Sequence, residues 1–194
     1  MNIEPLLATI NQHIELTTDE QEILLEHLTF RNYLKGQFVL QQGDVCKFET
    51  IVVKGCLKTF HINEEGDEHI IRFSLENWWA ADLGSFINQT PANCNIQCLE
   101  NSEVIQISYE NIQKLYVLIP KLERFFRIRI EKGFAASESR IIRNLSLTAT
   151  EKYLSFKERY PQIEQRVPQY MIASYLGMTK EFLSKLRSQL ISHQ

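Results

Sequence analysis

The segment from Lys121 to Leu147 constrains the fold of this chain more than any other. It contains no proline, and its apolar residues recur at the spacing of one helical face, so it predicts a single helix about 40 Å long at 1.5 Å per residue. A helix of that length needs a partner for its apolar stripe, and a second copy of the chain is the simplest one. The residues assigned to this dimer contact are Leu122, Phe126, Ile130, Phe134 and Ile141. The alternative, that the stripe packs on the β-rich part of the same chain, stays open.

Residues 33–108 show a different residue pattern. Short runs of β-forming residues, such as Leu57–Ile62, are separated by turns at Gly43, Gly55 and Gly66. Strands at this spacing predict a small antiparallel barrel or jelly roll. The first thirty residues are predicted to be helical, and Thr17–Glu20 offers an N-cap and an acidic first turn. After Ser108 the apolar period becomes that of a helix again.

The segment 169–188 has the spacing of a helix-turn-helix. Small Ala173 allows two helices to approach closely, Gly177 takes the backbone through the tight turn, and apolar Leu183 closes the seam between the helices. Pro168 suits the start of the first helix, and Thr179 can cap the second. An ordinary helical hairpin with a glycine turn would satisfy the same spacing.

The second helix of this motif carries the candidate DNA contacts. Lys180 can donate to guanine and Glu181 can accept from cytosine, because residues near the start of a recognition helix reach base edges. Thr179, Ser184 and Arg187 are candidates for phosphate contacts. The full set of predicted DNA-binding residues is Thr179, Lys180, Glu181, Ser184, Lys185 and Arg187.

Charge is distributed unevenly along the chain. Residues 1–120 hold 7 Lys/Arg and 17 Asp/Glu, a net charge of −10, whereas residues 121–194 hold 14 and 7, a net charge of +7. A basic C-terminal third on an acidic body is typical of a protein that presents one end to phosphates. A solvated basic surface would give the same count.

These patterns together predict an α+β chain. Residues 1–120 form an antiparallel, jelly-roll-like β-roll sensor domain, 121–147 a dimerisation helix, and 148–194 a helix-turn-helix domain. Thr148 and Glu151 form a capping box that opens the last domain, and Pro161 ends its first helix.

The composition also narrows the class of protein. The chain has no apolar run long enough to span a membrane and no signal-peptide pattern at Met1–Pro5, so a cytoplasmic protein without membrane contact is expected. The four cysteines lie in apolar or strand-like runs without Cys-x-x-Cys spacing, which predicts buried thiols and no disulfide.

With its helical lead-in, β-roll, long helix and C-terminal helix-turn-helix, the chain resembles the CRP/FNR family of transcription regulators over nearly its whole length. The segment 176–186 is similar to the family's recognition helix, and Lys35-Gly36, Gln42–Asp44 and Val53–Gly55 are similar to its β-roll turns. The resemblance implies a homodimer that reads an inverted repeat in double-stranded DNA and regulates transcription, with RNA polymerase as a possible partner.

The β-roll departs from the family at its nucleotide cassette. Cyclic-nucleotide-binding members carry Gly-Glu-Leu followed about ten residues later by Arg-Ser/Thr-Ala. The corresponding positions here are Asp82, Leu83 and Gly84, followed by Ala92, Asn93 and Cys94. Ala92 stands where the family's arginine would pair with the phosphate, so the lost charge-assisted hydrogen bonds predict that cyclic AMP is not the effector.

No cofactor or metal is expected. Residues 1–45 contain no cysteine, which argues against the iron-sulfur cluster that sensing members carry near the N-terminus. Haem would need His61 or His69 as an axial ligand, and nothing further indicates one.

Two other functions compete with DNA binding. A cupin-like enzyme would need His61 and His69 as metal ligands, but the Glu64, Glu65 and Glu68 between them are typical of a solvated turn. The sequence therefore does not favour an enzyme. The other alternative is a ligand-sensing or protein-interaction module without DNA binding, in which Trp78 and Trp79 could line an apolar pocket if they are not core residues.

Overall fold

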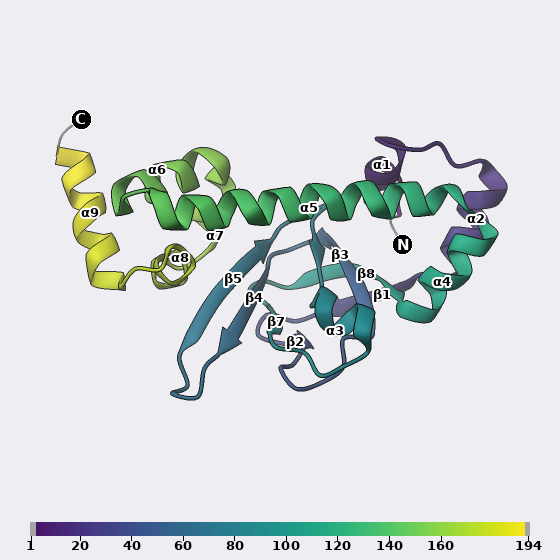
Figure 1. The fold of residues 1–194 in the computed structure, drawn as a ribbon, viewed down its shortest axis with the longest axis horizontal. Coiled ribbons are helices and arrows are strands. Elements are labelled where there is room, and N and C mark those ends of the chain that lie inside the picture. Colours follow the sequence, from purple (N-terminus) through teal and green to yellow (C-terminus); the bar gives the residue numbers. More distant parts are fainter. Residues whose placement is uncertain (1–2, 193–194) are drawn as a thin grey trace.

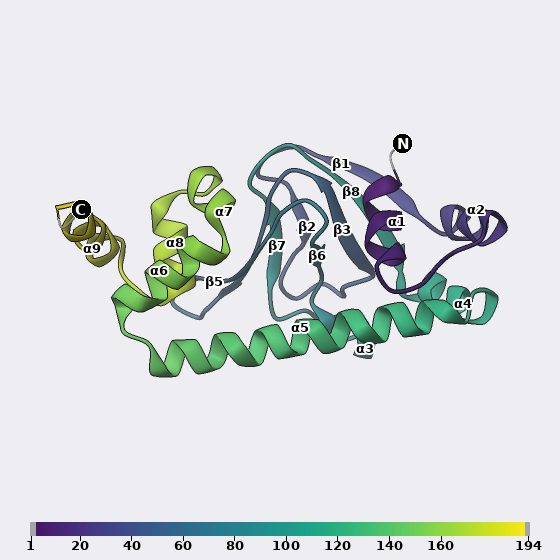
Figure 2. The same cartoon turned by 90° about the horizontal axis from the view of Figure 1, so that it is seen from above.

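The structure is a computed structural model that describes residues 3–192, without the side chains of the last two of these. A β-roll lies against the long helix α5, which runs across the whole molecule (Figure 1). The lead-in helices lie at one end of α5 and the C-terminal helices at the other (Figure 2). This arrangement confirms the predicted α+β fold with antiparallel sheets.

Two four-stranded sheets form the β-roll. The order in the first is β1 (Thr29–Tyr33), β8 (Ser102–Ser108), β3 (Phe48–Lys54) and β6 (Trp79–Ala80). The order in the second is β2 (Phe38–Leu40), β7 (Asn95–Cys98), β4 (Leu57–Ile62) and β5 (Glu68–Ser74).

The first strand begins at Thr29, earlier than the β-rich pattern that was predicted to start at residue 33. Thr29, the first residue of β1, lies opposite Gln106 of β8, and the pairing continues without interruption to Tyr33 opposite Ser102. Residues 29–32 alone give a weak strand signal, because the ladder that holds them comes from a segment far along the chain.

Four helices surround the roll before α5 begins. Thr17 caps the second of them with a capping box, in which its hydroxyl accepts from the Glu20 amide and the Glu20 carboxylate accepts from the Thr17 amide. The short third helix lies in the cassette segment and was not predicted. The four are α1 (Glu4–Asn11), α2 (Thr18–Glu26), α3 (Leu83–Asn88) and α4 (Tyr109–Leu118).

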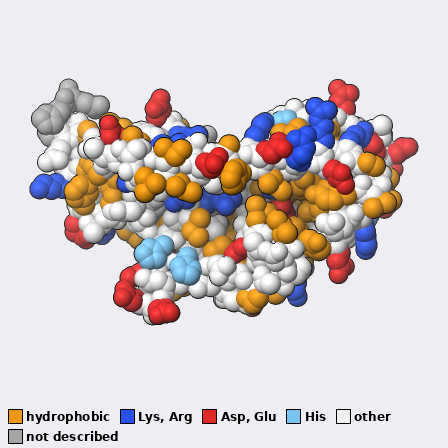
Figure 3. All heavy atoms as spheres, viewed as in Figure 1, with side chains coloured by type: hydrophobic (Ala, Val, Ile, Leu, Met, Phe, Trp, Pro, Cys, Tyr) orange, Lys and Arg blue, Asp and Glu red, His pale blue; other side chains and the backbone are white. Residues whose placement is uncertain are grey.

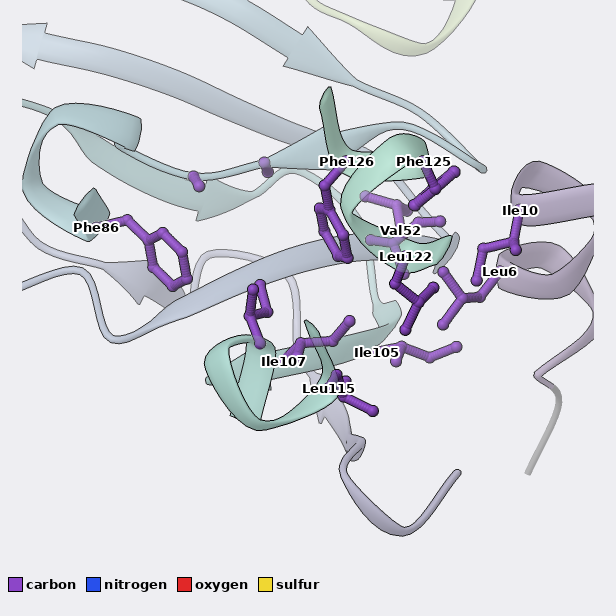
Figure 4. Packing of buried hydrophobic residues seen from close by; sticks show 14 of the residues in the cluster. Leu6, Ile10, Val52, Phe86, Ile105, Ile107, Leu115, Leu122, Phe125 and Phe126 are labelled. Atoms are coloured by element: carbon purple, nitrogen blue, oxygen red, sulfur yellow. The ribbon is translucent and has the colours of Figure 1, made fainter. Parts of the chain in front are cut away.

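Helix α5 spans Lys121–Ser146 as predicted, and its two ends have different surroundings. Near its start, Leu122, Phe125 and Phe126 are buried in the main core, where Leu122 and Phe125 face Leu6 and Ile10 of α1 (Figure 4). Arg129 follows and forms a buried ion pair with Glu49 of β3. This pair fixes α5 to the first sheet.

Four helices follow α5 in the described part of the chain. Thr148 caps α6 (Ala149–Arg159) with a capping box, as expected. Pro161 ends that helix but also begins an unpredicted one, because proline is well tolerated in a first turn. The remaining helices are α7 (Pro161–Arg166), α8 (Gln169–Leu176) and α9 (Lys180–Ser192).

A second core joins the C-terminal helices to the β-roll. Phe60 of β4 and Phe73 of β5 lie in one buried cluster with Phe156 of α6 and Ile172 of α8. The C-terminal domain therefore does not hang free from α5 but is docked on the second sheet.

Polar contacts reinforce this docking. The Ser174 hydroxyl of α8 accepts from the Ile70 amide at 3.0 Å and donates to the Glu68 carbonyl at 2.9 Å. Arg140 of α5 donates to carbonyls of both β5 and α8. The β-roll thus holds α8 in place, while α9 lies at the far tip of the molecule (Figures 1 and 2).

Candidate nucleic-acid interface

The turn between α8 and α9 is built by Gly177. Its backbone has φ 69° and ψ 38°, a left-handed conformation that glycine adopts without steric cost. The Met178 amide then donates to the Ala173 carbonyl at 2.9 Å, and the Thr179 hydroxyl accepts from the Phe182 amide at 3.2 Å. The sequence predicted both the glycine turn and the threonine cap.

The predicted seam between the two helices is present. Ile172 and Ala173 of α8 and Leu183 of α9 are each 1% exposed or less, and Leu176 and Leu186 are also buried. Because buried side chains are close-packed, a larger residue at Ala173 should push the two helices apart. The motif is therefore a packed helix-turn-helix.

Most of the predicted DNA-contacting residues lie on α9 or at its N-cap and are accessible to a ligand. The side chains of Thr179, Lys180, Glu181, Ser184 and Lys185 are exposed, and we call these five residues the recognition surface. Lys180, Glu181 and Lys185 form no ion pair within the described part of the chain. Their charges are therefore free to meet a ligand.

Arg187 lies elsewhere. It is half-buried, and its guanidinium turns back to the carboxylate of Glu164 on α7 at 3.8 Å. The same carboxylate accepts a hydrogen bond from Tyr153, and burial followed by this bond raises the pKa of Tyr153 to about 12. Arg187 thus belongs to a polar cluster inside the domain, which its sequence position alone does not indicate.

Sequence reasoning missed Phe182. This residue lies on α9 between Glu181 and Leu183, yet its side chain is 50% exposed. An exposed aromatic ring beside charged residues can pack on the methyl group of thymine. The only available signal was that Phe182 falls outside the apolar spacing of Leu183 and Leu186.

The predicted dimer residues on α5 divide into two groups. Leu122 and Phe126 are 0% and 3% exposed, so they fill this chain's own core and cannot contact a partner in this arrangement. Ile130, Phe134 and Ile141 are 41%, 65% and 59% exposed, and apolar side chains line this side of α5 (Figure 3). The first part of the stripe therefore packs on its own chain, and contact of the exposed part with a second chain stays a prediction.

The cassette segment, residues 81–94, is closed by its own hydrogen bonds. One oxygen of Asp82 accepts from the Ser85 amide at 3.0 Å and the other from the Asn93 amide at 2.9 Å. Burial acts to raise the pKa of Asp82, but these bonds outweigh it and lower the pKa. The Cys94 thiol also donates to Asp82, at 3.4 Å.

The other cassette residues are held equally firmly. Ala92 is 4% exposed, and its amide and carbonyl are paired with Asp44 and Gly43. Leu83 and Gly84 form the first turn of α3. The backbone of the segment is therefore tied both to itself and to the turn at Gly43 and Asp44.

A cation does lie near the cassette, on a strand where sequence reasoning did not look. Arg72 of β5 is exposed by its accessible surface, and partial burial of its guanidinium is the main cause that lowers its pKa. Lys and Arg side chains are visible below α5 (Figure 3).

The two candidate metal ligands lie side by side, because His61 of β4 is directly opposite His69 of β5. His61 is hydrogen-bonded to the Asn93 carbonyl at 2.7 Å. Among the described residues no group of three or more His, Cys, Asp or Glu side chains could hold a metal ion. All four cysteines are buried and unpaired. No helix in the described range is long and apolar enough to cross a bilayer.

Comparison with known proteins extends these observations. A model of the cyclic nucleotide-binding domain matches residues 30–117. The transcriptional activator protein Anr of Pseudomonas aeruginosa is 26% identical over 192 residues, covering 93% of this chain and 78% of that protein. The fumarate and nitrate reduction regulatory protein of Escherichia coli is 29% identical over 192 residues, covering 92% of this chain and 73% of that protein.

A solved structure shares the fold along most of the chain. The regulator CLP of Xanthomonas campestris, described as c-di-GMP responsive, superposes with a TM-score of 0.74 at 18% identity, covering 91% of this chain and 93% of that one.

Proposed function

Because the chain belongs to the CRP/FNR family of transcription regulators, we propose that it binds double-stranded DNA as a homodimer, with α9 as the recognition helix. The observation that carries this proposal is the recognition surface itself. Its residues are exposed at the tip of the molecule, on a helix whose opposite side is fixed by Leu183 and Leu186. A rigid helix with free charges near its N-terminus is what a major groove accepts.

The exposed stripe on α5 supports the dimer. Ile130, Phe134, Ile141 and Leu145 share one side of the helix, and Leu145 is 83% exposed. Exposed apolar residues at this spacing on a helix are typical of a contact between two helices.

Gly133 adds a separate argument for the same contact. A Cβ at this position would meet no atom of its own chain within 4 Å, although glycine in the middle of a helix costs about 1 kcal/mol relative to alanine. The chain's own packing does not explain the glycine, whereas the close approach of a second helix would.

We further propose that cyclic AMP does not control this protein. Both carboxylate oxygens of Asp82 are already engaged by backbone amides, and Ala92 offers no charge to a phosphate. A nucleotide would have to break these bonds before it gained its own. Arg72 is an exposed arginine of β5, so it does not stand at the cassette position that Ala92 occupies.

Selection from a randomised pool of DNA duplexes tests the proposed function. We expect the wild-type protein to enrich an inverted repeat whose half-sites lie about 34 Å apart, since two recognition helices enter successive major grooves. Lys180→Ala and Glu181→Ala should each enrich a different half-site sequence. Arg124→Ala, which changes an exposed residue near the other end of α5, should enrich the wild-type site. Enrichment of nothing by the folded wild-type protein would contradict the proposal.

Salt dependence separates the two classes of contact on α9. Ser184→Ala should weaken binding to all sequences alike, because a phosphate contact carries no sequence information. Thr179→Ser keeps the hydroxyl that caps α9 and should bind as the wild type does, whereas Thr179→Ala removes both the cap and the candidate phosphate contact. Lys185→Ala should also flatten the dependence of affinity on salt, since fewer counterions are released. Arg187→Ala is a poor test of a phosphate contact here, because it also breaks the cluster with Glu164.

A further inference from the structure

A cleft opens between the β-roll and the C-terminal domain, away from the cassette. It has a volume of about 540 Å³, which falls in the range of small-molecule sites. One wall is the turn between β5 and β6, with Glu76, Asn77 and Trp78, and the other is the junction of α6 and α7, with Arg159 and Tyr160. The two walls therefore belong to the two domains.

The turn between β5 and β6 holds Trp78 at the cleft. Asn77 has φ 69°, a left-handed conformation that is uncommon outside glycine. Its amide donates to the Val52 carbonyl at 2.8 Å, and the Trp78 carbonyl accepts from the Val52 amide at 3.0 Å. The backbone on both sides of the tryptophan is thus fixed to β3.

The ring of Trp78 offers an aromatic surface at this position. It is 37% exposed, and it meets the ring of Tyr160 edge to face, with centroids 5.6 Å apart. This pairing joins the two walls. An edge-to-face contact leaves a tryptophan face for a third ring, and such aromatic contacts are favourable beyond the area they bury.

The charges in the cleft favour an anion. Both oxygens of Glu76 accept hydrogen bonds from Arg166, at 2.8 and 2.9 Å, so its charge is compensated. The side chain of Arg159 is exposed and makes no hydrogen bond or ion pair with the described part of the chain. A guanidinium in this state can bind a carboxylate through two parallel bonds.

We propose that this cleft binds a small planar aromatic carboxylate, with its ring on Trp78 and Tyr160 and its carboxylate on Arg159. Because the site exists only when the two domains are docked, a bound ligand stabilises the docked arrangement. This site is distinct from the cassette segment and does not depend on DNA binding.

Calorimetric titration of the full chain with sodium 1-naphthoate, without DNA, tests the inference. We expect one saturable site per chain with a dissociation constant of about 1 mM or below. Arg159→Gln should raise this constant about fivefold or more. Neutral 1-naphthamide should bind the wild type as weakly as 1-naphthoate binds Arg159→Gln. The matched control Arg124→Gln removes an exposed arginine far from the cleft and should bind as the wild type does.

Two tryptophan variants test the aromatic contact. Trp78→Leu should abolish saturable binding, whereas Trp78→Phe, which keeps a ring, should retain it. If Trp78→Leu does not fold, Arg159→Gln still decides the matter, because its side chain is exposed. No saturable binding by the wild type up to about 10 mM, or equal affinities for Arg159→Gln and Arg124→Gln, would overturn the proposal. Because no DNA is present, either result leaves the DNA-binding proposal untouched.

Discussion

Arg166 joins the two domains through four hydrogen bonds, and its replacement should weaken their docking measurably. It ends α7, and its guanidinium donates two hydrogen bonds to Glu76 and two to Glu100, all between 2.7 and 2.9 Å. Both carboxylates belong to the β-roll side, at sequence separations of 90 and 66 residues. Replacing Arg166 by methionine keeps most of the apolar stem but removes all four bonds.

The loss of unfolding free energy expected for Arg166→Met follows from the four hydrogen bonds and from how far they are exposed to solvent. Hydrogen bonds to charged groups contribute about 1.5–3 kcal/mol each when buried, whereas an exposed ion pair contributes about 0.2–1 kcal/mol. The side chains here are 25% exposed for Arg166 and 35% exposed for each glutamate. We therefore expect Arg166→Met to lower the free energy of unfolding by about 1–3 kcal/mol.

The lowered pKa of Glu76 gives a second estimate of how much its contact with Arg166 stabilises the fold, and the two estimates agree. Hydrogen bonding to Arg166 lowers this pKa from 4.5 to about 2, which corresponds to at most about 3 kcal/mol at 1.36 kcal/mol per unit. Solvent screening at a site one-third exposed reduces this to about 1 kcal/mol. Because the folded-state pKa is the lower one, the contribution is present above about pH 4.5 and is lost as the pH falls towards 2.

Urea unfolding at pH 7 and at low pH measures both effects. Arg166→Met should unfold at lower urea than the wild type at pH 7, and the difference should shrink as the pH falls towards 2. Arg166→Lys keeps the positive charge but not the forked geometry of the guanidinium. It should unfold at a urea concentration between those of Arg166→Met and the wild type. The control Arg124→Met should match the wild type. A difference below about 0.5 kcal/mol between Arg166→Met and Arg124→Met would refute the reasoning.

Three further outcomes are expected. Phe134→Glu should convert a dimer to a monomer in sedimentation velocity, whereas Ala135→Glu, exposed on another side of α5, should leave the dimer intact; equal behaviour of the two would exclude the stripe as the contact. Gly55→Ala should destabilise the fold by about 3 kcal/mol in urea, because its Cβ would lie 2.3 Å from the Ser102 hydroxyl at φ +107°; wild-type stability would show that the turn can relax. Cyclic AMP at about 1 mM should give no saturable heat in calorimetry; a saturable signal would mean that the hydrogen bonds of Asp82 yield to the nucleotide.

The features that the sequence predicted correctly are those with local causes. The turn at Gly177 needs a left-handed residue, and Thr179 caps a helix that begins one residue later, so both signals lie within a few positions. The capping box at Thr148 and Glu151 has the same local character. For this reason the core of the DNA-binding motif could be placed from sequence alone.

The features that were missed depend on contacts between distant segments. Arg187 reads as an exposed basic residue until α7 brings Glu164 to it. The division of the α5 stripe between core and surface depends on where the β-roll ends against the helix, and helical periodicity is the same on both sides of that point. The Arg166 contacts join residues far apart in sequence, which no local pattern encodes.

The most direct test of the central claim counts the chains on one DNA site. Sedimentation velocity of the purified protein with the selected duplex should show two chains per inverted repeat. Scrambling one half-site should weaken binding by far more than a factor of two, because the two recognition helices act together on one rigid dimer. A single chain bound with full affinity to one half-site would contradict the proposal that the protein binds DNA as a dimer. Equal binding to a fully scrambled duplex would contradict sequence recognition by α9.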